Sequence, residues 1–453
     1  MLAKNKAPQY KAYLKKSSLL SVSQSKREQG NTMAIVSHYV LSPTINGFVL
    51  WVLREAIRTG KKRLYFMARD GYFMYHTAKE LCALMHLPLE CRYLKCSRYA
   101  IRIPLFSRYP KEAMEYICRH SIDVNMTKIL KRAGLSKEEC GEVLADLKVN
   151  YDAEEIIPYA ELKQVKKMLA QSEVFLKYMK EKSDEALPNL LGYLRQEGLL
   201  EDVGMAIVDS GWTGTMQKNL DLLIQLAGGK QKLEGYYWGL YEIPAGSERD
   251  RWHCYYFSPE GNIKEKVNFS NCLFEAIITA PHGMALGYQE ENNQYLVIQD
   301  EISEERKDFV RETGKYIKHY THRLMKKLAS MQLEEIDVDG DRKVIAELLK
   351  LFMAKPIKEE VELYGGILFS DDVLESCMQP VAGELSDKEL AENHLFNKIF
   401  TLLGGKNTTI KESAWFEGSA VRNGKNVKWH LLQYAAYKHL LYLKKNFRRR
   451  DNG

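Results

Sequence analysis

Three sequence patterns are missing from this 453-residue chain, and each absence excludes a class of protein. Its eight cysteines form no Cys-x-x-Cys pair, and no cluster of histidine and cysteine has the spacing of a zinc site. No apolar signal segment opens the chain, so we expect reduced thiols and a cytoplasmic location. The longest apolar stretches, such as residues 47–53, are shorter than the ~20 residues that cross a bilayer, so we expect no membrane-spanning helix.

A large net charge is missing as well. The formal charge of +7 is small for this length, and part of it is confined to the last ten residues. The basic residues of this tail are Lys444, Lys445, Arg448, Arg449 and Arg450. A local cationic tail suits an anionic small molecule or a membrane surface better than a nucleic-acid groove, so we expect no nucleic-acid partner. A solvated tail that only aids solubility is the alternative.

Core material, by contrast, is plentiful. Hydrophobic residues make up 45% of the chain and aromatic residues 11%, as in a globular protein rather than a disordered one. Because the chain is longer than one hydrophobic core usually grows, we expect two or three lobes, one of which carries the chemistry.

The first part of the chain predicts an α/β unit. Apolar residues recur at helical spacing over 36–57, and Gly60 is typical of a helix end. A short apolar strand at 63–67 follows, then a turn and a helix over 72–84. Another short strand, at 90–94, completes a pattern of alternating helices and strands, which favours a parallel sheet.

The same pattern returns after a long interval. The continuous apolar run 203–208 is typical of a buried parallel strand, with a helix over 216–226 and a strand at 235–241 behind it. We therefore expect an α/β fold with a parallel sheet.

We expect four parts. Residues 1–33 are polar and predict a mobile arm, and residues 34–107 and 201–300 together predict the α/β catalytic core. Successive amphipathic helices predict a helical insertion over 108–200, and residues 301–453 predict a helical C-terminal region that ends in the basic tail.

The segment that follows the strand at 203–208 has a composition that suits phosphate. It reads Asp-Ser-Gly-Trp-Thr-Gly-Thr and leads into a helix. Its glycines let the backbone approach an anion, and its amides and hydroxyls donate hydrogen bonds at the positive end of the helix. The predicted binding residues are Ser210, Gly211, Thr213, Gly214 and Thr215, while Asp209 faces ribose hydroxyls or a metal ion. An ordinary strand-to-helix connection is the alternative.

An earlier loop has the same position behind its strand. Ala-Arg-Asp-Gly at 68–71 follows the strand at 63–67 and opens a helix, where open α/β sheets place ligands. Arg69 offers several donors to a diphosphate, and Gly71 allows a close backbone approach. Asp70 either orients Arg69 or helps to hold magnesium. A surface turn with an internal ion pair is the alternative.

Two such loops in one chain resemble those of the phosphoribosyltransferases. In that family one loop binds the pyrophosphate of phosphoribosyl diphosphate, and a later loop binds its ribose 5-phosphate. The chain departs from the pattern at Ser210, which stands where most members have a second acid, and in the long stretch between the loops. An ordinary purine or pyrimidine enzyme is therefore disfavoured.

A resemblance to a narrower family covers roughly residues 36–300. The segments that carry it are Asn46-Gly47-Phe48, 64–72, Ser97-Arg98, 209–217 and 274–283. They resemble the glycan phosphoribosyltransferase domain of ribofuranosyltransferases, proteins that build ribofuranose into bacterial surface polysaccharides such as O antigens and capsules.

The resemblance implies a reaction. The enzyme would move 5-phosphoribosyl from phosphoribosyl diphosphate to a glycan acceptor, with release of pyrophosphate and inversion at the anomeric carbon. Arg69 and Asp209 would be catalytic, and Asp70 and Asp209 would hold magnesium. The acceptor would be a glycan on a lipid carrier at the inner face of the membrane, and other glycosyltransferases would act beside this protein.

A phosphatase of the haloacid dehalogenase type commonly shares the chain in that family. The nearest segment here is Asp-Val-Asp-Gly at 337–340, and a helical, glutamate-rich stretch precedes it where a buried strand is needed. We predict a solvated turn at this segment and a phosphatase that is a separate protein.

Other residues near the loops are candidates too. Ser97 and Arg98 follow the strand at 90–94 and would add donors to the same anion; the alternative is a strand-end cap with an exposed arginine. Glu275 lies among apolar residues, and burial would raise its pKa to suit a base that takes a proton from the acceptor hydroxyl. The alternative is a structural carboxylate paired with an arginine.

Two other functions share these loops. One is phosphoribosyl transfer to a base or small metabolite, which needs a stacking pocket. The other is a sugar-phosphate-binding partner of glycosyltransferases without turnover. In the glycan hypothesis the basic tail rests on anionic headgroups beside Trp429, Tyr434, Tyr437 and Tyr442, unless these aromatic residues belong to the helix core.

Overall fold

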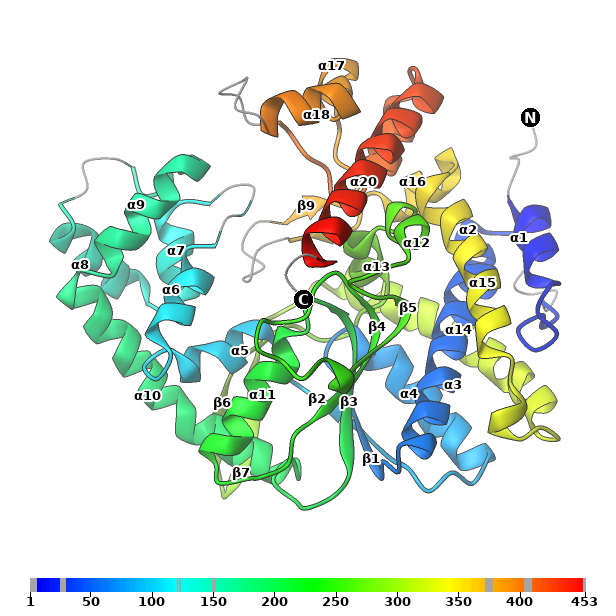
Figure 1. Cartoon of the computed structure of the whole chain (residues 1–453), viewed down its shortest axis with the longest axis horizontal. Helices are drawn as coiled ribbons and strands as arrows, with labels where there is room; N and C mark the ends of the chain where they lie inside the picture. The colour runs from blue at the N-terminus through cyan, green and yellow to red at the C-terminus, as the bar shows by residue number, and fades with distance from the viewer. Residues whose placement is uncertain are drawn as a thin grey trace.

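A five-stranded parallel sheet forms the centre of the computed structural model (Figure 1). Described are residues 6–24, 30–119, 121, 124–148, 152–370, 378–402 and 410–450. The strands are β1 (Arg63–Met67), β2 (Glu90–Leu94), β3 (Met205–Trp212), β4 (Glu234–Leu240) and β5 (Trp252–Phe257), in the order β2-β1-β3-β4-β5. Every neighbouring pair in this sheet runs parallel, which confirms the predicted α/β class.

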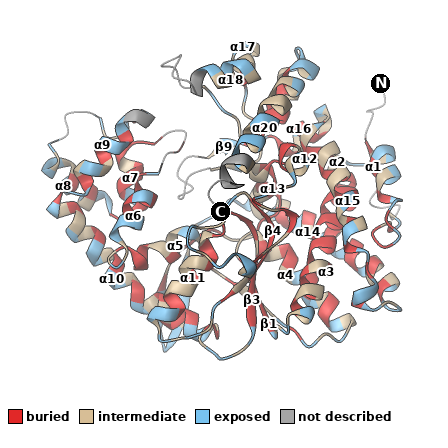
Figure 2. Ribbon diagram, in the orientation of Figure 1, coloured by how far each residue is buried: buried red, intermediate tan, exposed pale blue. Residues whose placement is uncertain are grey.

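Both faces of the sheet are buried (Figure 2). In β1, Phe66 faces one hydrophobic core and Tyr65 faces the other. The helix after β1, α4 (Gly71–Leu84), packs on the first core, and the helix after β3, α11 (Thr215–Leu226), packs on the second. The chain thus leaves two adjacent strands toward opposite faces, and an arrangement of this kind opens a crevice at their carboxyl ends.

A long helical rod runs through the core beside the sheet. It consists of α2 (Thr32–Val36), a π-helical segment η2 (Ser37–Leu41) and α3 (Ser42–Arg58), and the predicted stop, Gly60, follows with φ +68°. Among the described residues, this rod alone is long and apolar enough to cross a membrane, so the prediction that no stretch has that length is wrong. Of its most apolar window, 94% is buried inside the protein.

The N-terminal segment is packed against the body of the protein. Helix α1 (Ala7–Leu14) buries Tyr10 completely, and Lys6 Nζ forms a buried ion pair with Glu360 Oε2 at 2.8 Å. The prediction of a mobile arm over residues 1–33 is therefore wrong for its described part. Its few apolar residues follow no sustained period, so the sequence pattern does not show that they enter the core.

A helical lobe lies between β2 and β3 in the chain and at the left in Figure 1. It follows α5 (Arg98–Arg102) and the short helix η3 (Ile103–Leu105), and it comprises α6 (Pro110–Ile117), α7 (Met126–Arg132), α8 (Lys137–Asp146), α9 (Tyr159–Leu169) and α10 (Glu173–Gln196). The lobe has its own hydrophobic cluster, in which Ile129, Leu169 and Phe175 are fully buried.

The segment after β4 contains elements that the sequence did not predict. They are the short helix η4 (Arg249–Arg251), strand β5, helices α12 (Ile263–Val267) and α13 (Asn271–Ile277), and an antiparallel hairpin of β6 (Ala285–Glu291) and β7 (Gln294–Gln299). The hairpin packs on α10, where the rings of Tyr193 and Tyr288 stack at 4.5 Å.

The C-terminal region is mostly helical, as predicted. Its elements are α14 (Glu304–Leu328), η5 (Leu333–Glu335), α15 (Val338–Leu349), η6 (Lys350–Ala354), α16 (Lys358–Tyr364), β8 (Leu368–Phe369), β9 (Gln379–Pro380), α17 (Asp387–Glu392), α18 (Leu395–Leu402), α19 (Phe416–Asn423) and α20 (Val427–Arg450). Helices α14 and α15 join the main core through Ile317 and Ile345. Asp337, in the predicted solvated turn, is an exposed cap of α15 and accepts a hydrogen bond from Gly340 N at 2.9 Å.

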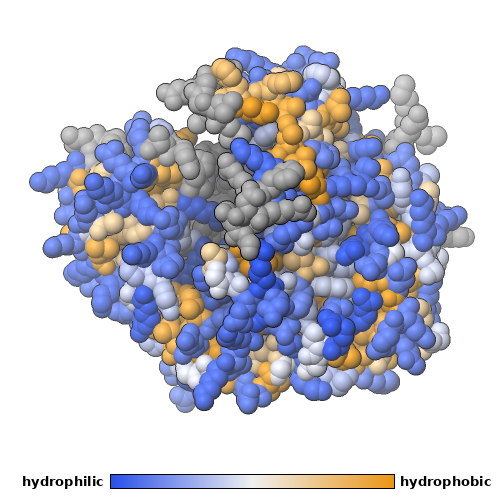
Figure 3. Space-filling view, in the orientation of Figure 1, coloured by the Kyte–Doolittle hydropathy of each residue, from blue (hydrophilic) through white to orange (hydrophobic). Residues whose placement is uncertain are grey.

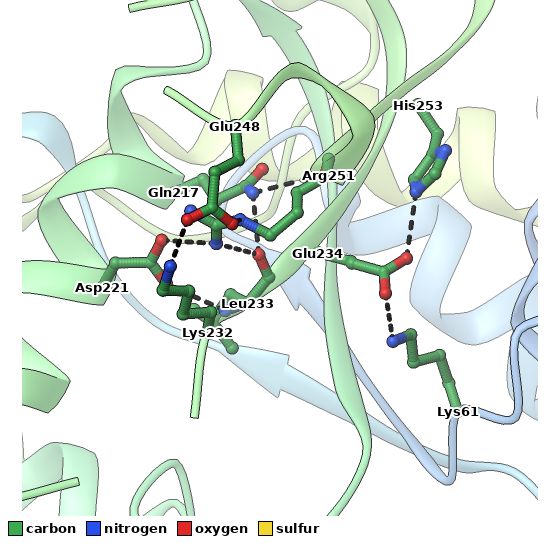
Figure 4. Close-up of polar contacts among 9 residues, drawn as sticks. All are labelled: Lys61, Gln217, Asp221, Lys232, Leu233, Glu234, Glu248, Arg251 and His253. Atoms are coloured by element: carbon green, nitrogen blue, oxygen red, sulfur yellow. Dashed lines mark hydrogen bonds and ion pairs between the residues drawn. The ribbon is translucent and has the colours of Figure 1, made fainter. Parts of the chain in front are cut away.

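A polar network holds α11 against the start of β4 (Figure 4). The Asp221 carboxylate of α11 accepts a hydrogen bond from Leu233 N at 2.8 Å and pairs with Arg251 Nη1 at 2.7 Å. Gln217 Nε2, also on α11, donates to Leu233 O at 2.8 Å. These contacts fix α11, whose first residue, Thr215, is the last residue of the segment 209–215, and so they hold that segment in place. Glu234, the first residue of β4, pairs with Lys61 and His253.

The seven cysteines that the structure describes are free thiols. Cys82 and Cys91 bring their Sγ atoms within 3.8 Å of each other without a disulfide. Cys377 and the side chains of Arg448, Arg449 and Arg450 lie outside the described residues.

We expect Leu14→Ala to lower the free energy of unfolding by about 2–4 kcal/mol, because it empties a buried position of the main core. Chemical denaturation followed by circular dichroism measures the change. The control is Lys11→Ala in the same helix, since Lys11 is exposed and should change stability by less than about 0.5 kcal/mol. Equal, negligible effects of both substitutions would mean that the N-terminal segment does not contribute to the core.

Candidate functional site

The crevice between β1 and β3 opens into a cleft of about 590 Å³. Several parts of the chain meet there: the turns after β1 and β2, the end of β3, the turn after β4, the α13 segment, the helical lobe and the C-terminal region. Its ionisable lining residues are Arg69, Asp70, Arg98, Tyr116, Arg119, Arg132, Asp209, Tyr241, Glu242, Cys96, Cys272, Glu275, Arg306, Tyr442 and Lys445. Six of these are arginine or lysine and four are aspartate or glutamate, so the cleft suits an anion that arrives with a cation.

The two predicted loops touch each other. The Ser210 hydroxyl, at the end of β3, donates a hydrogen bond to the Asp70 carboxylate in the turn after β1. Arg69 precedes Asp70 and also lines the cleft, and the Ala68–Arg69 peptide bond is cis. Ser210, which departs from the two-acid pattern, therefore links the turns of adjacent strands.

Two half-buried aspartates, Asp70 and Asp209, line the floor of the cleft. Burial is the main cause that raises the pKa of Asp70 well above its ordinary value, and the charges of Glu275 and Asp209 raise it further. Burial also raises the pKa of Asp209 to about 6, against the opposing effect of Arg98 and of the backbone amides of Ser210 and Gly211. Carboxylates that raise each other's pKa form a site whose negative charge a cation would offset.

Glu275 lies beside them on α13. Its carboxylate accepts a hydrogen bond from Trp212 Nε1, and its Oε1 atom is 3.8 Å from Arg98 Nη2. The side chain is 22% exposed and lines the cleft. The geometry contains the arginine partner of the structural alternative and also gives the carboxylate access to a ligand.

Ser97 and Arg98 have different tasks. Ser97 caps α5: its hydroxyl accepts a hydrogen bond from Ala100 N at 3.0 Å and donates to Ala285 O at 2.6 Å. The single hydroxyl proton of Ser97 is thus engaged with the protein, although Ser97 lines the cleft, and its role as a donor to an anion stays a prediction. The Arg98 side chain is 43% exposed and points its guanidinium toward Glu275, so it remains available to an anion in the cleft.

Strand β3 is longer than the sequence predicted, and this shortens the second loop. It continues beyond Val208 to Trp212, which pairs with Leu240 of β4. Only Thr213 and Gly214 connect β3 to α11. Thr213 lines the cleft, and the Thr215 hydroxyl at the start of α11 accepts a hydrogen bond from Arg102 Nη2 at 2.8 Å.

The packing of the protein itself favours glycine at the three glycine positions that were predicted to bind a ligand. A Cβ atom on Gly211, whose φ is +106°, would lie 2.6 Å from Gly239 O, and one on Gly214 would lie 2.5 Å from Trp252 Nε1. A Cβ on Gly71 would lie 3.1 Å from the carbonyl carbon of Phe66. These glycines and Thr215 are not among the described residues that line the cleft. The lining therefore does not include these four predicted binding residues.

Several cleft residues come from segments that sequence reasoning did not connect to the loops. Arg119 and Arg132 belong to the helical lobe, and Arg306 and Lys445 to the C-terminal region. The Arg132 guanidinium donates to Ile117 O at 3.1 Å and so helps to shape the lobe side of the cleft. Lys445 was marked only as part of the basic tail and no local pattern marks the three arginines, because only the fold brings these residues to the loops.

Arg102 is a further residue that the sequence did not single out. Its guanidinium lies 4.1 Å from the centre of the Tyr116 ring, and burial lowers its pKa to about 10, so it stays charged at neutral pH. Through Thr215 it adds a positive charge at the N-terminal end of α11, where the helix dipole also attracts anions.

No group of three or more histidine, cysteine, aspartate or glutamate residues with the arrangement of a metal site occurs among the described residues. Comparison with family models finds no match, and comparison with curated proteins finds none either.

We expect Asp209→Asn to raise the free energy of unfolding by about 1–3 kcal/mol above about pH 7. The folded protein binds the Asp209 proton more tightly than the unfolded chain, so the ionised carboxylate costs stability at high pH and the cost disappears as the pH falls through about 6 toward 4. Denaturation of both proteins across this pH range measures the difference. The control, Asp202→Asn at an exposed position, should show no such pH-dependent gain in stability. A gain for Asp209→Asn that is constant with pH would contradict the raised pKa of Asp209.

Proposed function

We propose that this cleft binds phosphoribosyl diphosphate and transfers its 5-phosphoribosyl group to a hydroxyl of a glycan. The observation that carries the proposal is the convergence of the two loops at the β1–β3 crevice, joined by the hydrogen bond between Ser210 and Asp70. Ligands of open α/β sheets bind where the chain leaves adjacent strands in opposite directions. The resemblance of the loop segments to the glycan phosphoribosyltransferase domain of ribofuranosyltransferases supports the donor and the acceptor class, and with them a divergent phosphoribosyltransferase-like fold.

The basic residues of the cleft divide between the two ends of this donor. Arg69 and Arg98 neutralise the diphosphate, which gains negative charge as it leaves. Thr213, which lines the cleft at the start of α11, receives the ribose 5-phosphate. The Arg102–Thr215 pair lies outside the lining and adds positive charge behind it. Charge-assisted hydrogen bonds at both ends hold the anomeric carbon between the two loops.

Asp70 and Asp209 fit a magnesium ion. Magnesium binds through one or two carboxylates together with substrate phosphates, and both aspartates have a pKa that burial and neighbouring acids raise. When bound, the ion neutralises charge on the diphosphate.

The transfer itself breaks the bond between the anomeric carbon and pyrophosphate and forms a bond from that carbon to the acceptor oxygen. The acceptor hydroxyl loses its proton to a carboxylate, and Glu275 is positioned to accept it from the open side of the cleft. Attack from the face opposite the leaving group inverts the anomeric centre. The product retains its 5-phosphate, which a separate phosphatase would remove.

Purified protein with magnesium and phosphoribosyl diphosphate should release pyrophosphate when a synthetic or lipid-linked glycan is added. Colorimetric detection of pyrophosphate measures the rate. Release with free purine or pyrimidine bases alone would instead support transfer to a base, and donor binding without release would support a sugar-phosphate-binding protein without turnover.

Arg69→Ala should lower kcat/KM for the glycan reaction by roughly 100-fold or more, because a group that stabilises the leaving charge is lost. The matched control is Arg58→Ala on α3, whose side chain is 63% exposed and lies outside the cleft lining. Unfolding profiles must be unchanged for both proteins. Near-normal activity of a folded Arg69→Ala protein would show that the diphosphate binds elsewhere.

A further inference from the structure

One face of α20 exposes an apolar stripe to solvent. Trp429 is 53% exposed, and the other members are Leu432 at 61%, Leu440 at 47% and Leu443 at 39%. Their spacing follows the helical repeat, so they lie along one side of the 24-residue helix. Figure 3 shows hydrophobic side chains gathered over α20.

Helix α18 extends this surface. Phe396 is 77% exposed and Phe400 is 53% exposed, and both lie on a helix that packs beside α20. His394, next to α18, contacts Trp429 with ring centres 6.3 Å apart. The four residues of the stripe and the two phenylalanines together form what we call the α18–α20 surface.

The opposite side of α20 is firmly anchored. Tyr434 stacks on Phe416 at 4.1 Å, and Lys438 Nζ pairs with Glu417 Oε1 at 2.8 Å in a buried position. Tyr442 stacks on Tyr241, which lines the cleft. The tyrosines that the sequence placed at a membrane are therefore turned inward, while Trp429 and the leucines face outward.

The charge of this part of the chain has one sign. Between residues 418 and 450 the sequence has no aspartate or glutamate, and its basic residues are Arg422, Lys425, Lys428, Lys438, Lys444, Lys445, Arg448, Arg449 and Arg450. Lys425, Lys428 and Lys444 are exposed beside the stripe. An apolar helix face flanked by lysine and arginine is the composition of helices that lie in the plane of an anionic membrane.

We propose that the α18–α20 surface docks on an anionic lipid bilayer, with α20 lying in the plane of the membrane. A second copy of the chain is the less suitable occupant, because its surface would bring the same cations against these cations and no acid from 418–450 to pair with them. Lipid phosphates supply the missing negative charge, and the headgroup region receives Trp429 and the leucines.

Docking has a consequence for the cleft. Tyr442 and Lys445, near the end of α20, line the cleft, so the helix that docks also forms part of its wall. The surface then holds the cleft close to lipid headgroups. This step rests on the proposed function, because it matches a glycan acceptor on a lipid carrier; the docking itself does not depend on it.

Vesicle flotation of the full chain tests the proposal. The protein should float with vesicles that mix phosphatidylcholine and phosphatidylglycerol, and much less with phosphatidylcholine alone. The combined variant Trp429→Ser, Leu432→Ser and Leu440→Ser keeps every charge and should bind at least about tenfold more weakly, because three apolar side chains no longer enter the bilayer. The matched control, Leu226→Ser, Leu296→Ser and Ile298→Ser, removes exposed apolar side chains elsewhere and should bind normally.

Unchanged flotation of the α20 variant, or equal flotation with neutral vesicles, would overturn the proposal. Analytical ultracentrifugation provides a second measurement: a wild-type dimer that the α20 substitutions dissociate would assign the surface to a second copy instead. Thermal unfolding confirms that each variant is folded. The vesicles contain neither donor nor acceptor, and Arg69→Ala should float like the wild type, so failure of docking and failure of the transfer activity are separable.

Discussion

The hydrogen bond from the Ser210 hydroxyl to the Asp70 carboxylate is possible only because β1 and β3 are neighbours in the sheet. Their parallel register places Phe66 beside Val208, so the residues that follow each strand emerge at the same edge. Segments 140 residues apart in sequence then share one crevice. Everything else in the cleft, from the helical lobe to the end of α20, is arranged around this junction.

Much of the sheet could be predicted because its elements are marked locally. The strand at 63–67 is a short apolar run between Gly60 and a charged turn, and the observed β1 has the same bounds. Strand β5 and the β6–β7 hairpin were not predicted, although β7 contains the apolar run 295–298; the residues of β7 alternate between exposed and half-buried. The packing of α1 was also missed, since tertiary contacts such as Lys6–Glu360 leave no local periodicity.

The candidate site was predictable at its centre and not at its rim. Arg69 and Asp70 follow β1, and Asp209 lies in the second half of β3. All three therefore stand near the carboxyl end of a parallel strand, a position that indicates a ligand site. The glycines illustrate the limit of that reasoning, because Gly211 is required by the close backbone of Gly239 rather than by a ligand contact. Likewise Gly47, part of the family resemblance, sits where a Cβ would lie 2.6 Å from Ile345 Cδ1, so a larger residue there would have to displace the Ile345 side chain.

The ionised carboxylates of the cleft lower the stability of the folded protein, and this effect accounts for the basic side chains around them. Asp70 and Asp209 are half-buried close to Glu275, whose charge raises the pKa of both aspartates. Within the protein Arg98 lowers the pKa of Asp209, and the Ser210 hydroxyl lowers that of Asp70. Both effects are smaller than that of burial, so additional positive charge at the floor of the cleft would stabilise the ionised aspartates. The rim of the cleft carries arginine and lysine. A ligand that brings a cation to the floor and an anion to the rim would neutralise the carboxylates and the basic side chains together. A magnesium-bound diphosphate has that distribution of charge.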